Sequence, residues 1–96
     1  MPHFVYILFS QSADRFYIGE TCDVAERLIQ HNSGFYKNSF TKQAADWTEF
    51  LKIECQSRKQ AIEIENFIKK MRNRNFYLKI KENPSIVNDL LRRFSA

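Results

Sequence analysis

The spacing of hydrophobic residues predicts two strands at the start of the chain. Residues 4–9 form an unbroken apolar run, and its β-branched and aromatic content is typical of a central strand buried on both faces. A polar turn over residues 11–14 separates this run from a second strand over residues 15–19, so the two should form a hairpin. The sequence does not fix the register of the hairpin, and Tyr6 and Tyr17 share a face only if that register allows it.

Helix signals follow directly. Residues 24–32 predict a helix that Asp23 caps, with Glu26 three residues later completing a capping box. Asn32, Ser33 and Gly34 supply the helix stop, and Gly34 suits the left-handed conformation beyond a helix C-terminus. The next segment, residues 35–46, has no clean period and reads as a polar loop that carries aromatic residues and lysines.

The second half of the chain contains one further strand and two clear helices. Residues 47–55 alternate, which predicts a strand with one face formed by Trp47, Glu49, Leu51, Ile53 and Cys55. Residues 57–72 predict the clearest helix, which Ser57 caps and whose buried stripe is Ala61, Ile64, Ile68 and Met71. Asn83 and Pro84 open a last helix, whose buried side is Ile86, Val87, Leu90, Leu91 and Phe94.

These elements predict a small α/β fold of the α+β type. We expect a three-stranded, mainly antiparallel sheet flanked by helices, in one domain that spans residues 1–96. No apolar run approaches the roughly 20 residues of a membrane span, and the first residues lack the pattern of a signal peptide. We therefore expect a cytoplasmic protein without a membrane partner, in which Cys22 and Cys55 are reduced thiols.

Charge adds a hint about the partner. The formal net charge is +4, and basic domains attract phosphate-bearing partners through counterion release. Basic residues of the last third form a solvated face in the simplest interpretation. We expect contact with nucleic acid from Arg15, Lys37, Lys42 and Lys69.

One spacing is specific. Arg27 and His31 lie four residues apart on the helix that follows Tyr17-Ile18-Gly19, and Val24 and Leu28 mark the buried side beside them. A cation and an imidazole next to a tyrosine strand can bind a phosphate. Taken with Phe4-Val5-Tyr6-Ile7 and with Glu65 in the later helix, this pattern resembles the GIY-YIG nuclease family over residues 4 to 75. The resemblance is to the small single-domain bacterial type, which is similar to the amino-terminal domain of the excision-repair endonuclease.

The resemblance implies a metal-dependent DNA endonuclease, structure-selective for single-stranded or branched DNA in repair or recombination. It implies Tyr6 or Tyr17 as the base, Arg27 at the scissile phosphate and His31 in proton transfer. It also implies one Mg²⁺ or Mn²⁺ on Glu65. Gly19 would let the backbone pass close to the substrate.

The resemblance bears on the remaining segment as well. It implies a short helix over residues 76–81, although their alternation reads as a strand, and we expect the helix. The family's last polar position falls on Tyr77 here, and Asn75 is a candidate substitute.

Other interpretations remain open at this point. The tyrosines can be ordinary sheet aromatics, Gly19 can serve only the strand exit, and Glu65 can simply pair with a cation. The chain can be a nucleic-acid-binding module that lost cleavage, or a nuclease directed at RNA.

Overall fold

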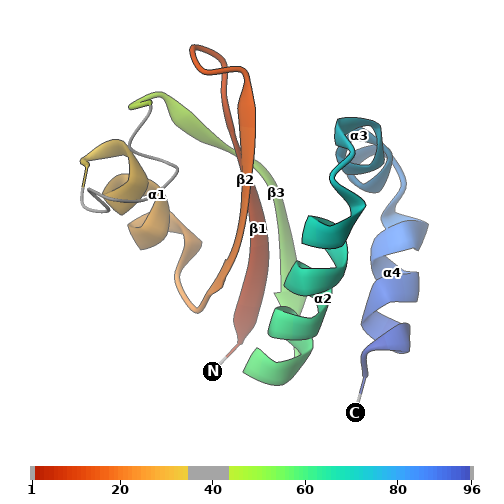
Figure 1. Cartoon of the computed structure of the whole chain (residues 1–96). Helices are drawn as coiled ribbons and strands as arrows, with labels where there is room; N and C mark the ends of the chain where they lie inside the picture. The colour runs from red at the N-terminus through yellow and green to blue at the C-terminus, as the bar shows by residue number, and fades with distance from the viewer. Residues whose placement is uncertain (1, 35–43, 96) are drawn as a thin grey trace.

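The computed structural model describes residues 2–34 and 44–95, and it confirms the α+β fold (Figure 1). Three strands form one antiparallel sheet in the order β2-β1-β3, so β1 is central and β2 is an edge strand. In chain order the elements are β1 (His3–Ser10), β2 (Arg15–Thr21), α1 (Val24–Asn32), β3 (Trp47–Cys55), α2 (Arg58–Met71), α3 (Arg74–Glu82) and α4 (Pro84–Arg93).

Helices cover both faces of the sheet. Figure 1 shows α1 on one face and α2, α3 and α4 on the other. Successive side chains of a strand point to opposite faces, so the central strand β1 supplies both cores, and four consecutive residues, Val5 to Leu8, are fully buried. The core under α2 includes Val5, Ile7, Ile53, Ile64, Ile68 and Ile80, and the core under α1 is Tyr6, Leu8, Val24 and Trp47.

The prediction that β3 presents one continuous face was wrong. Ile7 pairs with Leu51 but the next residue, Leu8, pairs with Glu49, so β3 carries an extra residue at Phe50. Such a bulge shifts the side-chain alternation by one residue. Trp47 therefore packs under α1, while Leu51, Ile53 and Cys55 pack under α2.

Local capping agrees with the sequence in part. The Asp23 side chain accepts a hydrogen bond from the Glu26 N–H, and Gly34 has a φ of 77°. The reciprocal half of the capping box does not form, because the Asp23 N–H donates to Thr21 Oγ1 instead. In α2, Ser57 accepts from the Gln60 N–H as expected, with Ala61, Ile64 and Ile68 buried.

Three further outcomes concern the last helices. Met71 is 41% exposed and does not continue the buried stripe of α2. Residues 76–81 are helical, because they lie within α3, as the resemblance implied. Asn83 precedes α4 without capping it through its side chain, since its Nδ2 donates to the Lys79 carbonyl of α3.

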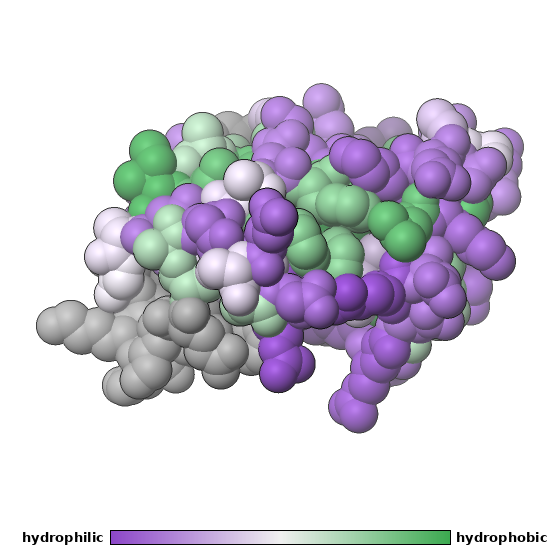
Figure 2. All heavy atoms as spheres, turned by 90° about the horizontal axis from the view of Figure 1, so that it is seen from above, coloured by the Kyte–Doolittle hydropathy of each residue, from purple (hydrophilic) through white to green (hydrophobic). Residues whose placement is uncertain are grey.

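Hydrophilic residues dominate the surface seen from the end where the β1–β2 turn and α3 lie, around a smaller apolar area (Figure 2). Cations lie over aromatic rings in this part of the molecule, with Lys81 4.7 Å from the Phe50 ring and Arg74 5.3 Å from the Phe16 ring. Within residues 2–34 and 44–95, no helix combines the length and apolarity needed to cross a bilayer.

Candidate active site

The hairpin register settles the question that the sequence left open. Tyr6 pairs with Gly19 and Leu8 pairs with Tyr17. Paired residues share a face, and so do residues two apart, so both tyrosines face α1. Their ring centroids lie 6.2 Å apart.

Gly19 makes room for the Tyr6 side chain. A Cβ at position 19 would lie 2.6 Å from the Tyr6 hydroxyl oxygen and 2.7 Å from its Cζ. The absence of a side chain at Gly19 therefore lets the Tyr6 ring lie across β2 toward α1. This close approach lies inside the protein, whereas the family resemblance suggested an approach to the substrate.

A Gly19→Ala variant should destabilise the protein by about 1–3 kcal/mol, the usual cost of overpacking a core. The Tyr6 ring is fully buried, so moving it away from the new methyl group would disturb its neighbours. Urea unfolding measures this loss. In a Tyr6→Phe background the cost should be smaller, because the atom nearest the new methyl is gone. Strictly additive effects of the two substitutions would contradict this explanation.

Two hydrogen bonds place α1 over the sheet. The Asn32 side chain at the end of α1 receives the Trp47 N–H at 2.7 Å and donates to the Trp47 carbonyl at 2.9 Å. An amide that satisfies both backbone groups of a single residue fixes the helix against the start of β3. The adjacent residue, His31, is thereby turned toward the two tyrosines. The sequence analysis treated Asn32 only as part of the helix stop.

His31 is the centre of this cluster. Its side chain is 2% exposed, its Nε2 lies 3.1 Å from the Tyr6 hydroxyl, and its ring centroid lies 4.7 Å from that of Tyr17. Burial, followed by the positive charge of Arg27, lowers the pKa of His31 from 6.5 to about 4. His31 is therefore neutral at pH 7 and can accept a hydrogen bond from Tyr6 or donate one to it, depending on its tautomer.

The lowered pKa of His31 predicts that the folded protein becomes less stable in acid. As the pH falls from about 6.5 to about 4, the unfolded chain protonates at His31 and the folded protein does not, so the free energy of unfolding falls. The full shift corresponds to about 3 kcal/mol at about 1.4 kcal/mol per pH unit. Urea unfolding at several pH values should show this slope in the wild type and a flatter one in His31→Gln. Equal slopes in the two proteins would contradict the prediction.

Arg27 lies on the same side of α1 as His31 and is half-buried. It lines a cavity of about 220 Å³ at the end of β2, together with Glu20, Cys22 and Arg58. The Glu20 carboxylate contacts two side chains here, because it lies 3.1 Å from His3 Nε2 and 3.8 Å from Arg58 Nε. Two arginines, from α1 and from α2, thus line the same cavity beside the edge strand.

Glu65 approaches the same edge strand from the opposite face of the sheet. Arg58 at the start of α2 lies beside Glu20 at the end of β2, while Arg72, just after α2, shares a cavity with Arg15 at the start of β2. The helix therefore runs antiparallel to β2. Glu65 is seven residues from each of these arginines and on their side of the helix, so it lies alongside the middle of β2.

The Glu65 carboxylate is held by a neighbour. Its side chain is 14% exposed, and Lys69 Nζ lies 2.7 Å from its Oε2. Among the residues that the structure describes, no three His, Cys, Asp or Glu side chains come together as a metal cluster. A single carboxylate with substrate oxygens and water nevertheless suits Mg²⁺, which is commonly held by one or two carboxylates plus phosphate oxygens. Glu65 thus offers one carboxylate to such a cation, and Lys69 contacts one of its two oxygens.

The other candidate residues are distributed as follows. Arg15 lines a cavity with α3, Lys69 pairs with Glu65, and Asn75 is exposed in the first turn of α3. The candidate contacts Lys37 and Lys42 lie outside the described residues. Tyr77 is 7% exposed and packs in the core under α2.

Comparison with known proteins gives one match. A family model described as the GIY-YIG catalytic domain matches residues 2–78 of the 96-residue chain. No curated protein and no solved structure matches the chain significantly.

Proposed function

Because the chain belongs to the GIY-YIG family of nucleases, whose chemistry is phosphodiester hydrolysis by an endonuclease, we propose that it cleaves DNA with the help of Mg²⁺ or Mn²⁺. The observation that carries this proposal is the cluster of Tyr6, Tyr17 and His31 beside Arg27 at the edge strand. Phosphodiester hydrolysis needs a base for water and a cation beside the developing charge. These residues supply both.

Tyr17 is the better candidate for the base. Tyr6 is fully buried and hydrogen-bonded to His31, whereas Tyr17 is partly exposed beside the same imidazole. Only a group that reaches solvent can take a proton from an attacking water. Tyr6 and His31 then act as positioning residues, since they hold the Tyr17 ring from the interior side.

Arg27 would stabilise the transition state. Its guanidinium carries a fixed charge with a planar fork that matches phosphate oxygens. Negative charge on these oxygens and on the leaving group grows as the bond breaks, so a preorganised cation gains more there than with intact DNA. Because His31 is neutral, Arg27 supplies the permanent positive charge on α1.

Glu65 would hold the cation. A bound Mg²⁺ or Mn²⁺ would neutralise charge on the leaving oxygen, which is the chemistry that the residues above lack. A cation held through Oε2 would displace the Lys69 ammonium, which lies 2.7 Å from that oxygen. Lys69 would then be available to a substrate phosphate.

The substrate that we propose is single-stranded or branched DNA, processed in repair or recombination. Contacts to the DNA backbone would come from half-buried Arg27 and from the basic side chains beside β2, which are Arg15, Arg58, Arg72 and Lys69. Contacts of this kind carry no base information. The competing functions are a binding module without cleavage and a nuclease directed at RNA. In the same assay a binding module would give no cleavage product, and a nuclease directed at RNA would cleave the RNA substrates.

The test is incubation of the purified protein with labelled single-stranded, flap, branched and duplex DNA and with matched RNA. Each substrate is offered with Mg²⁺, with Mn²⁺ or with chelator. We expect cleavage of single-stranded or branched DNA with either metal, and none in chelator. Binding of all DNA substrates without cleavage under any condition would support the binding module and overturn the nuclease.

A further inference from the structure

A cavity lined by cations lies at the end of α2, and we call it the α2 cavity. It has a volume of about 480 Å³ and is lined by Asn66, Lys69, Lys70 and Arg72. Of these four side chains three are cationic and none is a carboxylate. Lys69 and Lys70 belong to the last turn of α2, and Arg72 follows the helix directly.

Two of the three cations are not neutralised by the protein. Lys69 is paired, because its Nζ lies 2.7 Å from Glu65 Oε2. The side chains of Lys70 and Arg72 form no ion pair and no hydrogen bond with residues 2–34 and 44–95. The α2 cavity therefore presents two positive charges to whatever enters it.

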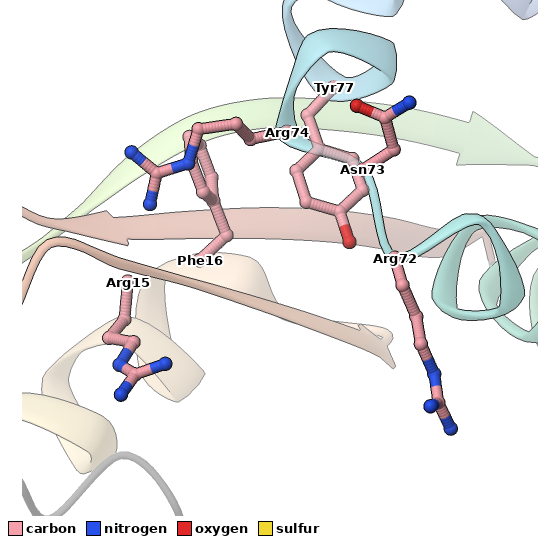
Figure 3. Close-up of a pocket in the computed structure, with 6 residues that line it drawn as sticks. All are labelled: Arg15, Phe16, Arg72, Asn73, Arg74 and Tyr77. Atoms are coloured by element: carbon pink, nitrogen blue, oxygen red, sulfur yellow. The ribbon is translucent and has the colours of Figure 1, made fainter.

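Arg72 has a backbone conformation that favours glycine. Its φ is 45° and its ψ is 42°, the left-handed conformation that glycine usually supplies at a helix end. Such strain in a residue other than glycine is found at functional sites. Figure 3 shows the Arg72 side chain extended away from Asn73 and Tyr77, with which it borders a smaller cavity of about 240 Å³. No contact within the described residues accounts for an arginine at this position.

The simplest alternative is an ordinary solvated face. Cations in the last turn of a helix are favoured by the helix dipole, and this alone explains Lys69 and Lys70. The dipole does not explain Arg72, because it requires no side chain at the left-handed residue, where glycine is the usual choice. Arg72 is thus the residue that points to a ligand.

We propose that the α2 cavity binds a phosphate of the nucleic-acid strand outside the cleavage site, with Lys70 and Arg72 as the groups that contact it. A guanidinium fork matches two phosphate oxygens, and an ammonium group adds a compact charge beside it. The inference rests on the proposed function in taking nucleic acid as the ligand.

The α2 cavity adjoins the candidate active site. Lys69 lines the cavity and also contacts Glu65, so the two sites share this side chain. Arg72 follows Glu65 by seven residues, or about 10 Å along the helix at about 1.5 Å per residue. A strand that rises about 3.4 Å per nucleotide covers this distance within a few nucleotides. One strand can therefore reach both sites.

The experiment measures binding in chelator, without cleavage, to a labelled single strand of roughly 12 nucleotides at several salt concentrations. Lys70→Gln and Arg72→Gly should each lower the slope of log affinity against log salt by about 0.7, the value for one phosphate contact on a single strand. At about 0.1 M salt this corresponds to roughly fivefold weaker binding, relative to 1 M salt where the contact no longer contributes.

The matched control is Lys79→Gln. Lys79 is also an exposed lysine in the last turn of a helix, α3, and it does not line the α2 cavity. Its substitution removes the same charge and should leave both affinity and slope nearly unchanged. An unchanged slope in Lys70→Gln and Arg72→Gly, or an equal loss in Lys79→Gln, would overturn the proposal.

Urea unfolding shows that the weaker binding does not come from a damaged fold. Arg72→Gly should keep or raise the unfolding midpoint, because glycine suits a φ of 45°. Lys70→Gln should keep the midpoint, because the Lys70 side chain has no partner among the described residues. Weaker binding at an equal or higher midpoint would support a role in binding.

The source of the anion is tested with inorganic phosphate and with an oligoglutamate peptide, each titrated into the wild type and Lys70→Gln. We expect no binding of either that depends on Lys70 at about 0.1 M salt, because a strand brings several phosphates to the protein at once. Binding of phosphate or peptide that depends on Lys70, beside strand binding that does not, would overturn the proposal.

These measurements separate the two proposals. Strand binding that depends on Lys70 and Arg72 in a protein that never cleaves DNA would support the α2 cavity and reject the nuclease. Cleavage of DNA by a protein whose strand binding ignores both residues would do the reverse.

Discussion

Glu65→Gln should lower the rate of DNA cleavage by at least about 10³-fold, because a bound metal contributes several kcal/mol of charge stabilisation in the transition state. The amide keeps the size of the carboxylate and loses its charge, so the divalent cation loses its protein ligand. The i,i+4 ion pair with Lys69 is partly exposed, with 49% of the Lys69 side chain and 14% of the Glu65 side chain accessible, so its loss should cost about 1 kcal/mol or less. Single-turnover cleavage and urea unfolding measure the two effects.

The matched control is Glu63→Gln. Glu63 belongs to the same helix and loses the same charge, but it lines a cavity with Phe67 and Arg93 of α4, away from β2. Its cleavage rate should stay close to that of the wild type. Calorimetry of Mn²⁺ binding should show weaker binding for Glu65→Gln alone, and cleavage by Glu65→Gln at the wild-type rate would eliminate Glu65 as the metal ligand.

Tyr17→Phe should lower the cleavage rate by about 10²- to 10⁴-fold, the range that a positioned general base contributes. The partly exposed Tyr17 hydroxyl is the one that can reach an attacking water, and removing it leaves the ring contact with His31 in place. A phenol ordinarily titrates near pH 10 and acts as a base in its ionised form, so the wild-type rate should rise with pH around neutrality. The variant should lose both the rate and most of this pH dependence.

Tyr6→Phe is the companion variant and should behave differently. It removes the hydrogen bond between the Tyr6 hydroxyl and His31 Nε2 inside the protein, where both side chains are almost fully buried. We expect a loss of about 1–3 kcal/mol in the free energy of unfolding and a smaller loss of cleavage than for Tyr17→Phe. A nearly inactive Tyr6→Phe beside an active Tyr17→Phe would assign the base to Tyr6 instead.

Elements whose signals are local could be predicted well. Helix α2 has a capping serine and a buried stripe with helical spacing, and both features lie within one short segment. The apolar run at β1 indicated a strand buried on both faces, which a central strand must be. For α3 the local pattern was misleading, and the family resemblance gave the helix because it carries information about tertiary packing.

Polar contacts between distant segments were missed. Asn32 looked like a helix stop, and its two bonds to Trp47 join residues 15 positions apart in the chain. Tyr77 looked like a departure from the family pattern, and its place in a basic cavity depends on the packing of α3 against the start of β2. No periodicity in the sequence encodes such a contact.

The sequence by itself determined the secondary elements other than α3, and the spacing of Tyr6, Tyr17, Gly19, Arg27 and His31, because propensity, capping and periodicity act over a few residues. The tertiary structure decided what those residues do for one another. The hairpin register brought Tyr6 opposite Gly19, and the bulge at Phe50 turned Trp47 toward α1. Side chains of a strand alternate with a period of two, so a shift of one residue moves each of them to the other face, and only the packing of both cores selects among these alternatives.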